Sequence, residues 1–120
     1  MTNKKYLYIN SRDELYRVDI ASIAYFEADG NYTHFMLCNQ QRGTVCMNLL
    51  QMQRLLTESL GQQASIFARV GKSYIVNLTY VYHIHTVKQM LVLSDGVNFT
   101  HRINLSKAAL VQLKQLFVKK

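Results

Sequence analysis

Short runs of β-branched and aromatic residues, each ended by turn-forming residues, recur along the sequence and constrain the fold most strongly. The clearest turns are Asp29-Gly30-Asn31 and Asp95-Gly96, and each has strand-like residues on both sides, as in β-hairpins. The sequence contains no proline to interrupt a strand. About eight to ten short strands at this spacing predict an antiparallel β architecture and not a doubly wound α/β sheet. The expected strands cover residues 6–11, 15–18, 20–26, 32–37, 43–47, 66–70, 74–77, 81–87, 90–93 and 97–100.

Two segments change to the period of an α-helix. The first follows Asn48, whose side chain suits an N-cap, and ends at Gly61, which suits a C-cap. The second begins at Ser106 and runs to the C-terminal lysines, where the helix dipole favours cations. The expected buried residues are Leu49, Met52, Leu55, Leu56 and Leu60 in the first helix and Ala109, Leu110, Leu113, Leu116 and Phe117 in the second. The predicted fold is therefore mainly β with two short helices.

The size and charge of the chain limit its function. Its 120 residues suit one domain covering residues 1–120, and 49% apolar residues suffice for an ordinary core. No sustained apolar segment resembles a signal peptide or a membrane span, so we expect a cytoplasmic protein without a membrane partner. Fourteen Lys and Arg against seven Asp and Glu give a net charge of +7, which favours a polyanionic partner. These charges are scattered along the chain, unlike those of a membrane-binding amphipathic helix.

The two cysteines, Cys38 and Cys46, flank the turn-like segment QQRG at residues 40–43. This spacing allows them to face each other across a hairpin. Two cysteines without a secretory signal are more typical of reduced thiols in the cytoplasm, which is the interpretation we favour.

The segment Gly71-Lys72-Ser73 looks like the end of a phosphate-binding P-loop. A P-loop needs an earlier glycine, where this chain has Ile66, and a helix after the lysine, whereas residues 73–77 are β-branched and aromatic. These two departures exclude a nucleotide site of this type, and we expect no cofactor.

Other catalytic or metal-binding patterns are equally weak. His83 and His85 share one face of an expected strand, but no acidic residue or cysteine lies close by in sequence to complete a metal site. Most of the seven carboxylates are far apart in sequence, and neither cysteine has a neighbouring histidine. We therefore expect no metal and no enzymatic activity.

The segment IFARVGKSYIVNL at residues 66–78 resembles the signature of LytTR domains, the DNA-binding modules of bacterial transcriptional regulators. Residues 19–33 and 93–110 are similar to further segments of that family in the same order, so the resemblance covers nearly the whole chain. The sequence departs from the family at Gly71, where a histidine is usual, and at Thr100-His101, where an Ile-Ser pair is more frequent. The matching signature residues are Phe67, Arg69, Lys72, Ser73, Tyr74, Val76 and Asn77.

The resemblance implies an elongated, mainly antiparallel fold whose loops, in place of a recognition helix, enter successive major grooves. It also implies promoter duplex DNA with repeated half-sites as the partner, two copies of the domain on that DNA, and in many relatives a preceding receiver or sensor domain. This chain is then either a stand-alone regulator or the output module of a longer two-component response regulator. The DNA-facing positions of the family fall on Asn31, Tyr32, Thr33, His34, Arg69, Lys72, Ser73 and Arg102.

The chemistry of these side chains agrees with such roles. The guanidinium of Arg102 suits guanine O6 and N7, and the amide of Asn31 suits adenine. Thr33 suits a thymine methyl or a phosphate, while Lys72 and Ser73 suit phosphates. Arg102 is expected in a short polar link between the last strand and the last helix, where few structural roles exist for an arginine.

Structural roles compete with these assignments. Asn31, like Asp29, suits a turn whatever else it does, and Tyr32 suits packing. Arg69 lies in a strand and can hold the neighbouring backbone.

Two other function classes stay open from the sequence alone. The basic charge and eight tyrosines also suit a single-stranded nucleic-acid binder, in which Tyr32, Tyr74, Tyr80 and Tyr82 matter more than Arg102. The departure at Gly71 is compatible with a protein-interaction module that has kept the fold but lost its DNA site.

Overall fold

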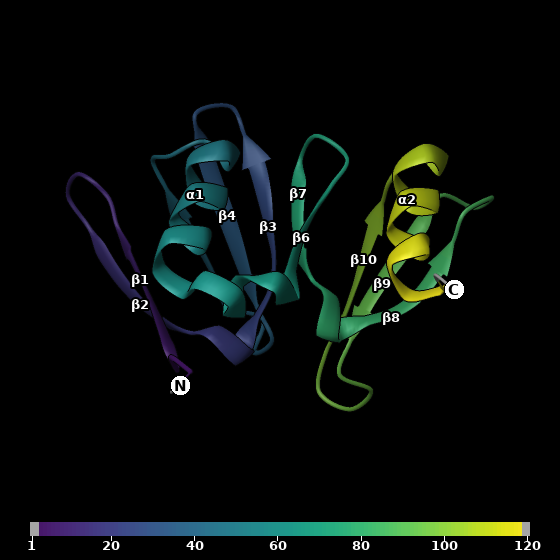
Figure 1. Cartoon of the computed structure of the whole chain (residues 1–120), viewed down its shortest axis with the longest axis horizontal. Helices are drawn as coiled ribbons and strands as arrows, with labels where there is room; N and C mark the ends of the chain where they lie inside the picture. The colour runs from purple at the N-terminus through teal and green to yellow at the C-terminus, as the bar shows by residue number, and fades with distance from the viewer. Residues whose placement is uncertain (1–2, 119–120) are drawn as a thin grey trace.

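A computed structural model describes residues 3–118, and these contain ten strands and two α-helices (Figure 1). The strand and helix content predicted from the sequence is confirmed, as is the antiparallel arrangement. The elements are β1 (Tyr6–Asn10), β2 (Leu15–Asp19), β3 (Ile23–Asp29), β4 (Tyr32–Leu37), β5 (Arg42–Val45), α1 (Leu49–Leu60), β6 (Phe67–Val70), β7 (Tyr74–Asn77), β8 (Val81–His85), β9 (Met90–Ser94), β10 (Thr100–Asn104) and α2 (Lys107–Val118). Neither helix is long and apolar enough to cross a membrane.

The strands form three antiparallel sheets. A five-stranded sheet has the order β5-β4-β3-β7-β6, a three-stranded sheet has the order β10-β9-β8, and β1 pairs with β2 alone. The described residues extend over 42 × 36 × 27 Å, with the five-stranded sheet in the middle (Figure 1). In the same view α1 lies over β3 and β4, and α2 lies over the three-stranded sheet.

The five-stranded sheet contributes to two hydrophobic cores, one on each face. Because side chains alternate along a strand, neighbouring residues of β3 and β7 belong to different cores. Phe26 and Ile75 pack with α1 and the β1–β2 hairpin, whereas their neighbours Tyr25 and Val76 pack with the three-stranded sheet and α2. Both faces of the central strands are therefore covered, and these strands hold the rest of the molecule together.

Local sequence chemistry explains where α1 begins and ends. The Asn48 side chain accepts a hydrogen bond from the Gln51 N–H, and the Gln51 side chain accepts one from the Asn48 N–H, at 2.8 Å each. Gly61 ends the helix at a φ of +57°, a left-handed conformation that suits glycine. Helix α1 buries Leu49, Met52, Leu56 and Leu60, and Leu55 packs half-buried against the same core.

Helix α2 differs from expectation at its C-terminal end. The Ser106 hydroxyl accepts a hydrogen bond from the Ala109 N–H, and Ala109, Leu110 and Leu113 are buried as predicted. The predicted burial of Leu116 and Phe117 is wrong, because 52% and 51% of their surfaces are exposed. The helical period predicts which face of α2 is buried, but it does not predict how far along the helix this burial extends. Beyond Leu113, no described element covers α2 fully.

The last strand also begins later than expected. Residues 97–99, predicted as strand, form a loop around the Asp95 carboxylate, which accepts hydrogen bonds from the N–H groups of Val97, Asn98 and Phe99. These hydrogen bonds lower the pKa of Asp95 to about 2. Strand β10 consequently starts at Thr100, and the predicted position of Arg102 in a link before α2 is wrong because Arg102 lies inside β10, opposite Val92.

The two cysteines do not face each other. In the β4–β5 hairpin, Met36 pairs with Arg42 near the turn and Thr33 pairs with Val45 at the other end. Cys38 therefore lies beyond the turn end of the pairing and Cys46 beyond the opposite end, and both thiols are free. The favoured interpretation, two reduced thiols, agrees with this arrangement.

Candidate nucleic-acid interface

Two turns that carry predicted DNA contacts project from the same end of the five-stranded sheet (Figure 1). The first joins β3 to β4 and contains Asn31, and the second joins β6 to β7 and contains Lys72 and Ser73. Strands β3 and β7 are direct neighbours, and the Ala28 N–H donates a hydrogen bond to the Ser73 carbonyl at 2.8 Å. The two turns are therefore held side by side.

The junction between β10 and α2 lies next to the second turn. A Cβ atom added at Gly71 would stand 3.7 Å from Ala109 Cβ and 3.8 Å from Leu105 Cδ2. Gly71 itself has a φ of +62°, which suits glycine. We call the three adjoining segments, residues 29–32, 71–73 and 104–107, the turn edge.

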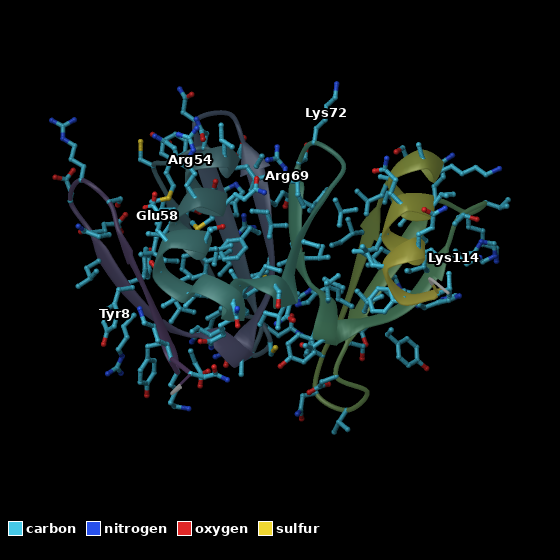
Figure 2. The ribbon with its side chains drawn as sticks, in the orientation of Figure 1. Tyr8, Arg54, Glu58, Arg69, Lys72 and Lys114 are labelled. Carbon is cyan, nitrogen blue, oxygen red and sulfur yellow. The ribbon has the colours of Figure 1, made fainter. Side chains whose placement is uncertain are left out.

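Several predicted contact residues are exposed on or near the turn edge. Asn31, Lys72 and Ser73 are exposed, and half of the Tyr32 surface is accessible to solvent. Figure 2 shows the Lys72 side chain pointing away from the molecule at the tip of its turn. Lys107, at the start of α2, adds to this edge an exposed cation that was not among the predicted contacts. A polyanion approaching this end would meet Lys72 and Lys107 without obstruction.

Thr33 is not available for DNA contact in this fold. Its side chain is completely buried, and its hydroxyl donates a hydrogen bond to the Met47 carbonyl at 2.8 Å. The alternation of β4 places Thr33 on the same face as buried Phe35, so the pattern of the strand already contained this signal. This burial does not favour the predicted contact by Thr33, and the contact set proposed below omits it.

His34 is engaged with protein groups on both sides of its ring. Its Nδ1 lies 2.7 Å from the Thr44 hydroxyl, and its Nε2 lies 2.9 Å from Asp29 Oδ2. Only 18% of the His34 side chain is exposed. The geometry therefore favours a role for His34 in holding Asp29 over a contact of its own with DNA.

Arg69 also makes structural contacts. Its guanidinium donates hydrogen bonds to the Lys72 carbonyl at 3.0 Å and to Gln53 Oε1 of α1 at 3.2 Å. The alternative expectation, in which Arg69 holds neighbouring backbone, is the one that this geometry favours. Arg69 fixes the turn on which Lys72 stands.

Arg102 is exposed in β10 and borders a hollow on the outer face of the three-stranded sheet. Its Nη1 lies 3.4 Å from Met90 Sδ, a weak contact that leaves the other donors of the guanidinium available. The hollow has a volume of about 400 Å³, and Tyr82 and His83 also line it. The guanidinium of Arg102 is therefore accessible to a ligand, although Arg102 lies in a strand and not in a loop.

The tyrosines do not form one stacking surface. Tyr74 donates a hydrogen bond to Glu27 Oε2 at 3.2 Å, and Tyr80 donates one to the Ala21 carbonyl. Burial, and secondly the Glu27 carboxylate, raise the pKa of Tyr74 to about 12. Tyr82, which is 72% exposed, projects alone from β8. This arrangement does not favour the single-stranded nucleic-acid binder.

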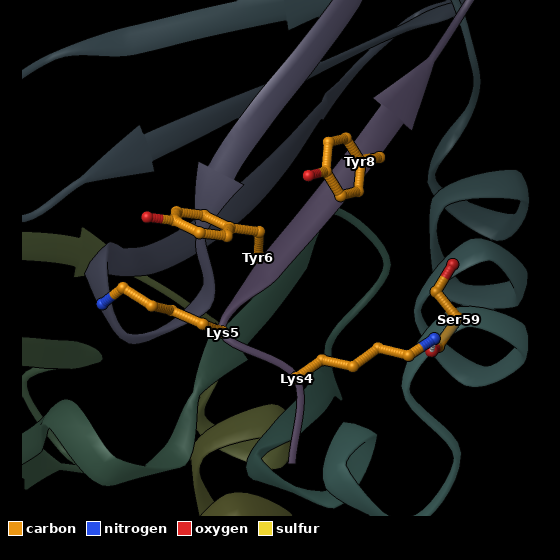
Figure 3. Close-up of a pocket in the computed structure, with 5 residues that line it drawn as sticks. All are labelled: Lys4, Lys5, Tyr6, Tyr8 and Ser59. Carbon is orange, nitrogen blue, oxygen red and sulfur yellow. Dashed lines mark hydrogen bonds between the residues drawn. The ribbon is translucent and has the colours of Figure 1, made fainter. Parts of the chain in front are cut away.

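A separate hollow near the N-terminus is a weaker candidate site. Lys4, Lys5, Tyr6, Tyr8 and Ser59 line a volume of about 330 Å³ (Figure 3). Lys4 Nζ donates to the Ser59 carbonyl at 2.6 Å, and Lys5 Nζ pairs with Asp19 at 3.1 Å, so both cations have protein partners. The N-terminus lies at the end of the molecule opposite the two turns (Figure 1), so this hollow does not extend the turn edge.

The two histidines of β8 are not grouped with further possible metal ligands among residues 3–118. The rings of His83 and His85 lie with their centroids 6.0 Å apart on β8. Among residues 3–118, no group of three or more His, Cys, Asp and Glu side chains is placed to hold a metal ion.

Comparison with known proteins agrees with this geometry. The profile of the LytTr DNA-binding domain family matches residues 13–118. The chain belongs to this LytTR family. DNA binding in transcription regulation is accordingly its function class, and the resemblance noted in the sequence is confirmed.

One solved structure shows the same LytTR fold. It is the LytTr DNA-binding domain of a protein from Bacillus cereus described as a methyl-accepting/DNA response regulator. The TM-score is 0.66 at 20% sequence identity, and the alignment covers 96% of this chain and 98% of the other. No curated protein sequence matches the chain.

The three-stranded and the five-stranded sheet of this LytTR domain meet at His101. Its ring lies 5.5 Å from that of Tyr25 in β3 and 5.3 Å from that of Phe99, measured between centroids. His101 Nε2 is buried and has no hydrogen-bond partner among residues 3–118. Burial lowers the pKa of His101, and the Leu37 backbone opposes this effect.

Acid is therefore expected to destabilise the LytTR fold through His101. Because the folded-state pKa lies below the unfolded-state value, the unfolded chain binds more protons, and stability falls as pH decreases below about 6.5. Replacing His101 with phenylalanine should make the urea midpoint vary less between pH 7 and pH 5. The exposed-residue variant His83→Gln is the control, and an equal pH dependence in wild type and His101→Phe would contradict the assignment.

Proposed function

We propose that this chain binds duplex DNA sequence-specifically and that its DNA-binding surface consists of the turn edge and Arg102, which precedes this edge on β10. The observation that supports this proposal best is the placement of two turns, contributed by neighbouring strands, beside the β10–α2 junction. In this proposal these turns, in place of a recognition helix, enter successive major grooves, which are about 12 Å wide. The net charge of +7 favours approach to the phosphate backbone.

Individual roles follow from side-chain chemistry and exposure. Arg102 contacts guanine through two donors, and Asn31 pairs with adenine through its amide. Lys72 and Ser73 bind phosphates and set the register of the protein on the duplex. Tyr32 contributes a half-exposed ring beside Asn31. Arg69 and His34 act by positioning the two turns, since their polar groups already bond to protein atoms.

The biological setting that we propose is regulation of transcription in the bacterial cytoplasm. Two copies bind repeated half-sites in a promoter, and a receiver or sensor domain supplies the input signal. The Bacillus cereus protein with the same fold, described as a response regulator, supports this setting by analogy. A module that has lost its DNA site would lack the exposed cations of the turn edge, so the structure gives that alternative no support.

The decisive experiment compares Arg102→Ala with Lys72→Ala on a selected binding site and on unrelated duplexes over a salt series. Arg102→Ala is expected to weaken binding to the selected site by about 1–3 kcal/mol and to leave unrelated duplexes nearly unchanged. Lys72→Ala should weaken all duplexes alike and reduce the slope of log K against log salt by about one unit or less. Fluorescence anisotropy with labelled duplexes measures both effects.

Matched controls come from cations that belong neither to the turn edge nor to the proposed base contact of Arg102. Lys114→Ala removes an exposed lysine from α2, and Arg17→Ala removes an exposed arginine from β2. Both controls should bind like wild type. Equal losses for Arg102→Ala and Lys72→Ala on every sequence would refute the division between base and phosphate contacts. Failure of wild type to bind any duplex at low salt would refute the proposed function.

A further inference from the structure

Asp29 places a negative charge on the surface proposed to bind DNA. The residue stands at the end of β3, at the start of the turn that presents Asn31, and 70% of its side chain is exposed. A carboxylate on such a surface repels phosphates and reduces non-specific affinity. A favourable contact between this carboxylate and a base would offset the loss of affinity.

The carboxylate of Asp29 is not needed to form the turn between β3 and β4. In the Asp95 loop, the carboxylate accepts hydrogen bonds from three backbone N–H groups and so shapes the chain. Asp29 bonds to no backbone group of its own turn, and within residues 3–118 its Oδ1 accepts no hydrogen bond. Gly30 provides the turn conformation with a φ of +61°. Asp29 thus differs from a residue that only forms a turn.

A chain of hydrogen bonds across three strands holds the carboxylate in place. Thr44 of β5 bonds to His34 Nδ1 at 2.7 Å, and His34 Nε2 bonds to Asp29 Oδ2 at 2.9 Å. His34 pairs directly with Thr44 in the β4–β5 ladder, and its ring is mostly buried. One carboxylate oxygen is therefore fixed by protein, while the other remains available beside Asn31. Fixing a polar group before binding reduces the entropy lost on recognition.

We propose that Asp29 reads a cytosine in the same major groove that Asn31 contacts, and that His34 is its positioning residue. This inference rests on the proposed function of the turn edge. An ionised carboxylate only accepts hydrogen bonds, and cytosine offers a donor at N4 without an acceptor next to it on the same base. Guanine and thymine present acceptors, and the N6 donor of adenine is flanked by the acceptor N7. Asp29 therefore selects cytosine and excludes guanine and thymine.

The test measures base preference separately from overall affinity. A preferred duplex is first selected with the wild-type protein, and each position is then varied to all four bases. Asp29→Asn is expected to lose the preference for cytosine at one position by about tenfold, with adenine gaining because an amide suits N6 and N7. Affinity for non-specific duplex should rise about twofold to threefold in the same variant, because a repelling charge is gone.

Glu58→Gln provides the matched control, since it removes one exposed carboxylate near the C-terminal end of α1. It should leave the base preference unchanged. His34→Leu should weaken the cytosine preference without altering charge repulsion, whereas His34→Gln, which keeps a side-chain donor, should retain part of it. A purely structural role for His34 would instead lower the melting temperature and weaken binding to all duplexes alike.

Two outcomes separate this inference from the function on which it rests. If wild type selects a sequence but Asp29→Asn retains every base preference, the cytosine contact is refuted and the proposed function stands. If wild type binds no duplex at low salt, both are refuted. Circular dichroism of Asp29→Asn and both His34 variants shows that each tested protein is folded.

Discussion

Replacing Asn77 with alanine is expected to lower the free energy of unfolding by about 3 kcal/mol. Asn77 is 1% exposed, and its amide group donates to the Ile23 carbonyl at 2.9 Å. Its side-chain oxygen accepts from the Thr79 N–H at 3.0 Å and from the Thr79 hydroxyl at 2.6 Å. Alanine removes these bonds and leaves the carbonyl of fully buried Ile23 without its partner and without water, which costs more than the bond itself contributed.

Urea unfolding monitored by circular dichroism measures this loss. Asn104→Ala, at the exposed end of β10, is the control and should change stability by no more than about 0.5 kcal/mol. A loss below about 1 kcal/mol for Asn77→Ala would mean that other groups satisfy the Ile23 carbonyl and the Thr79 N–H. At temperatures where Asn77→Ala remains folded, its preference among duplexes should equal that of wild type, because Asn77 is buried away from the turn edge.

Adding a single methyl group at Gly43 is expected to destabilise the fold by a similar amount, about 3 kcal/mol. Gly43 pairs with Phe35 across the β4–β5 ladder, and the Phe35 ring lies over the glycine. A Cβ atom at position 43 would stand 2.2 Å from Phe35 Cζ. The ring is 2% exposed and packs edge-on against Tyr16 with centroids 5.0 Å apart, so it has little room to move.

A double-mutant cycle distinguishes this clash from a general loss of β5. Phe35→Leu opens space above position 43, so Gly43→Ala should cost at least about 1 kcal/mol less in the Phe35→Leu background than in wild type. Thermal or urea unfolding of the four proteins provides the cycle. Strict additivity of the two substitutions would contradict the proposed contact between the Phe35 ring and the added methyl group.

Local sequence rules located several features of the fold well. The turns at Gly30 and Gly61, the Asn48 cap and the alternation of the strands depend on interactions between residues close in sequence, and these predictions are confirmed. Where prediction failed, a distant or competing group decided the outcome. The Asp95 carboxylate delays the start of β10, and the absence of a full cover beyond Leu113 leaves the end of α2 exposed.

The family signature at residues 66–78 is determined more by the packing of the fold than by the proposed DNA contacts. Phe67 packs against Phe26 with ring centroids 5.8 Å apart, and Val76 and Asn77 are buried. Arg69 supports the turn through Gln53, a partner sixteen residues away in sequence. These residues make the resemblance recognisable because the core requires them. Apart from Arg102 in β10, the residues proposed to touch DNA lie in or beside short exposed turns, where the sequence is free to vary without unfolding the domain.

The roles of His34 and Arg69 could not be derived from the sequence for a related reason. Each side chain suits nucleic acid by its chemistry, and only the three-dimensional register shows that Thr44, Asp29 and Gln53 already occupy its polar atoms. The sequence placed these turns where the structure has them, but it could not separate the groups that face outward from those that hold the turns in place.

The backbone hydrogen bond between Ala28 and Ser73 joins two turns on strands that lie about 4.8 Å apart. If these turns bind DNA as proposed, the distance between their contacts cannot adjust to the duplex. One inserted base pair would shift the contacted groups by about 3.4 Å and rotate them by about 35°. Substitutions in the turns can therefore change which bases an operator must contain, while the spacing between those bases is fixed by the pairing of β3 with β7.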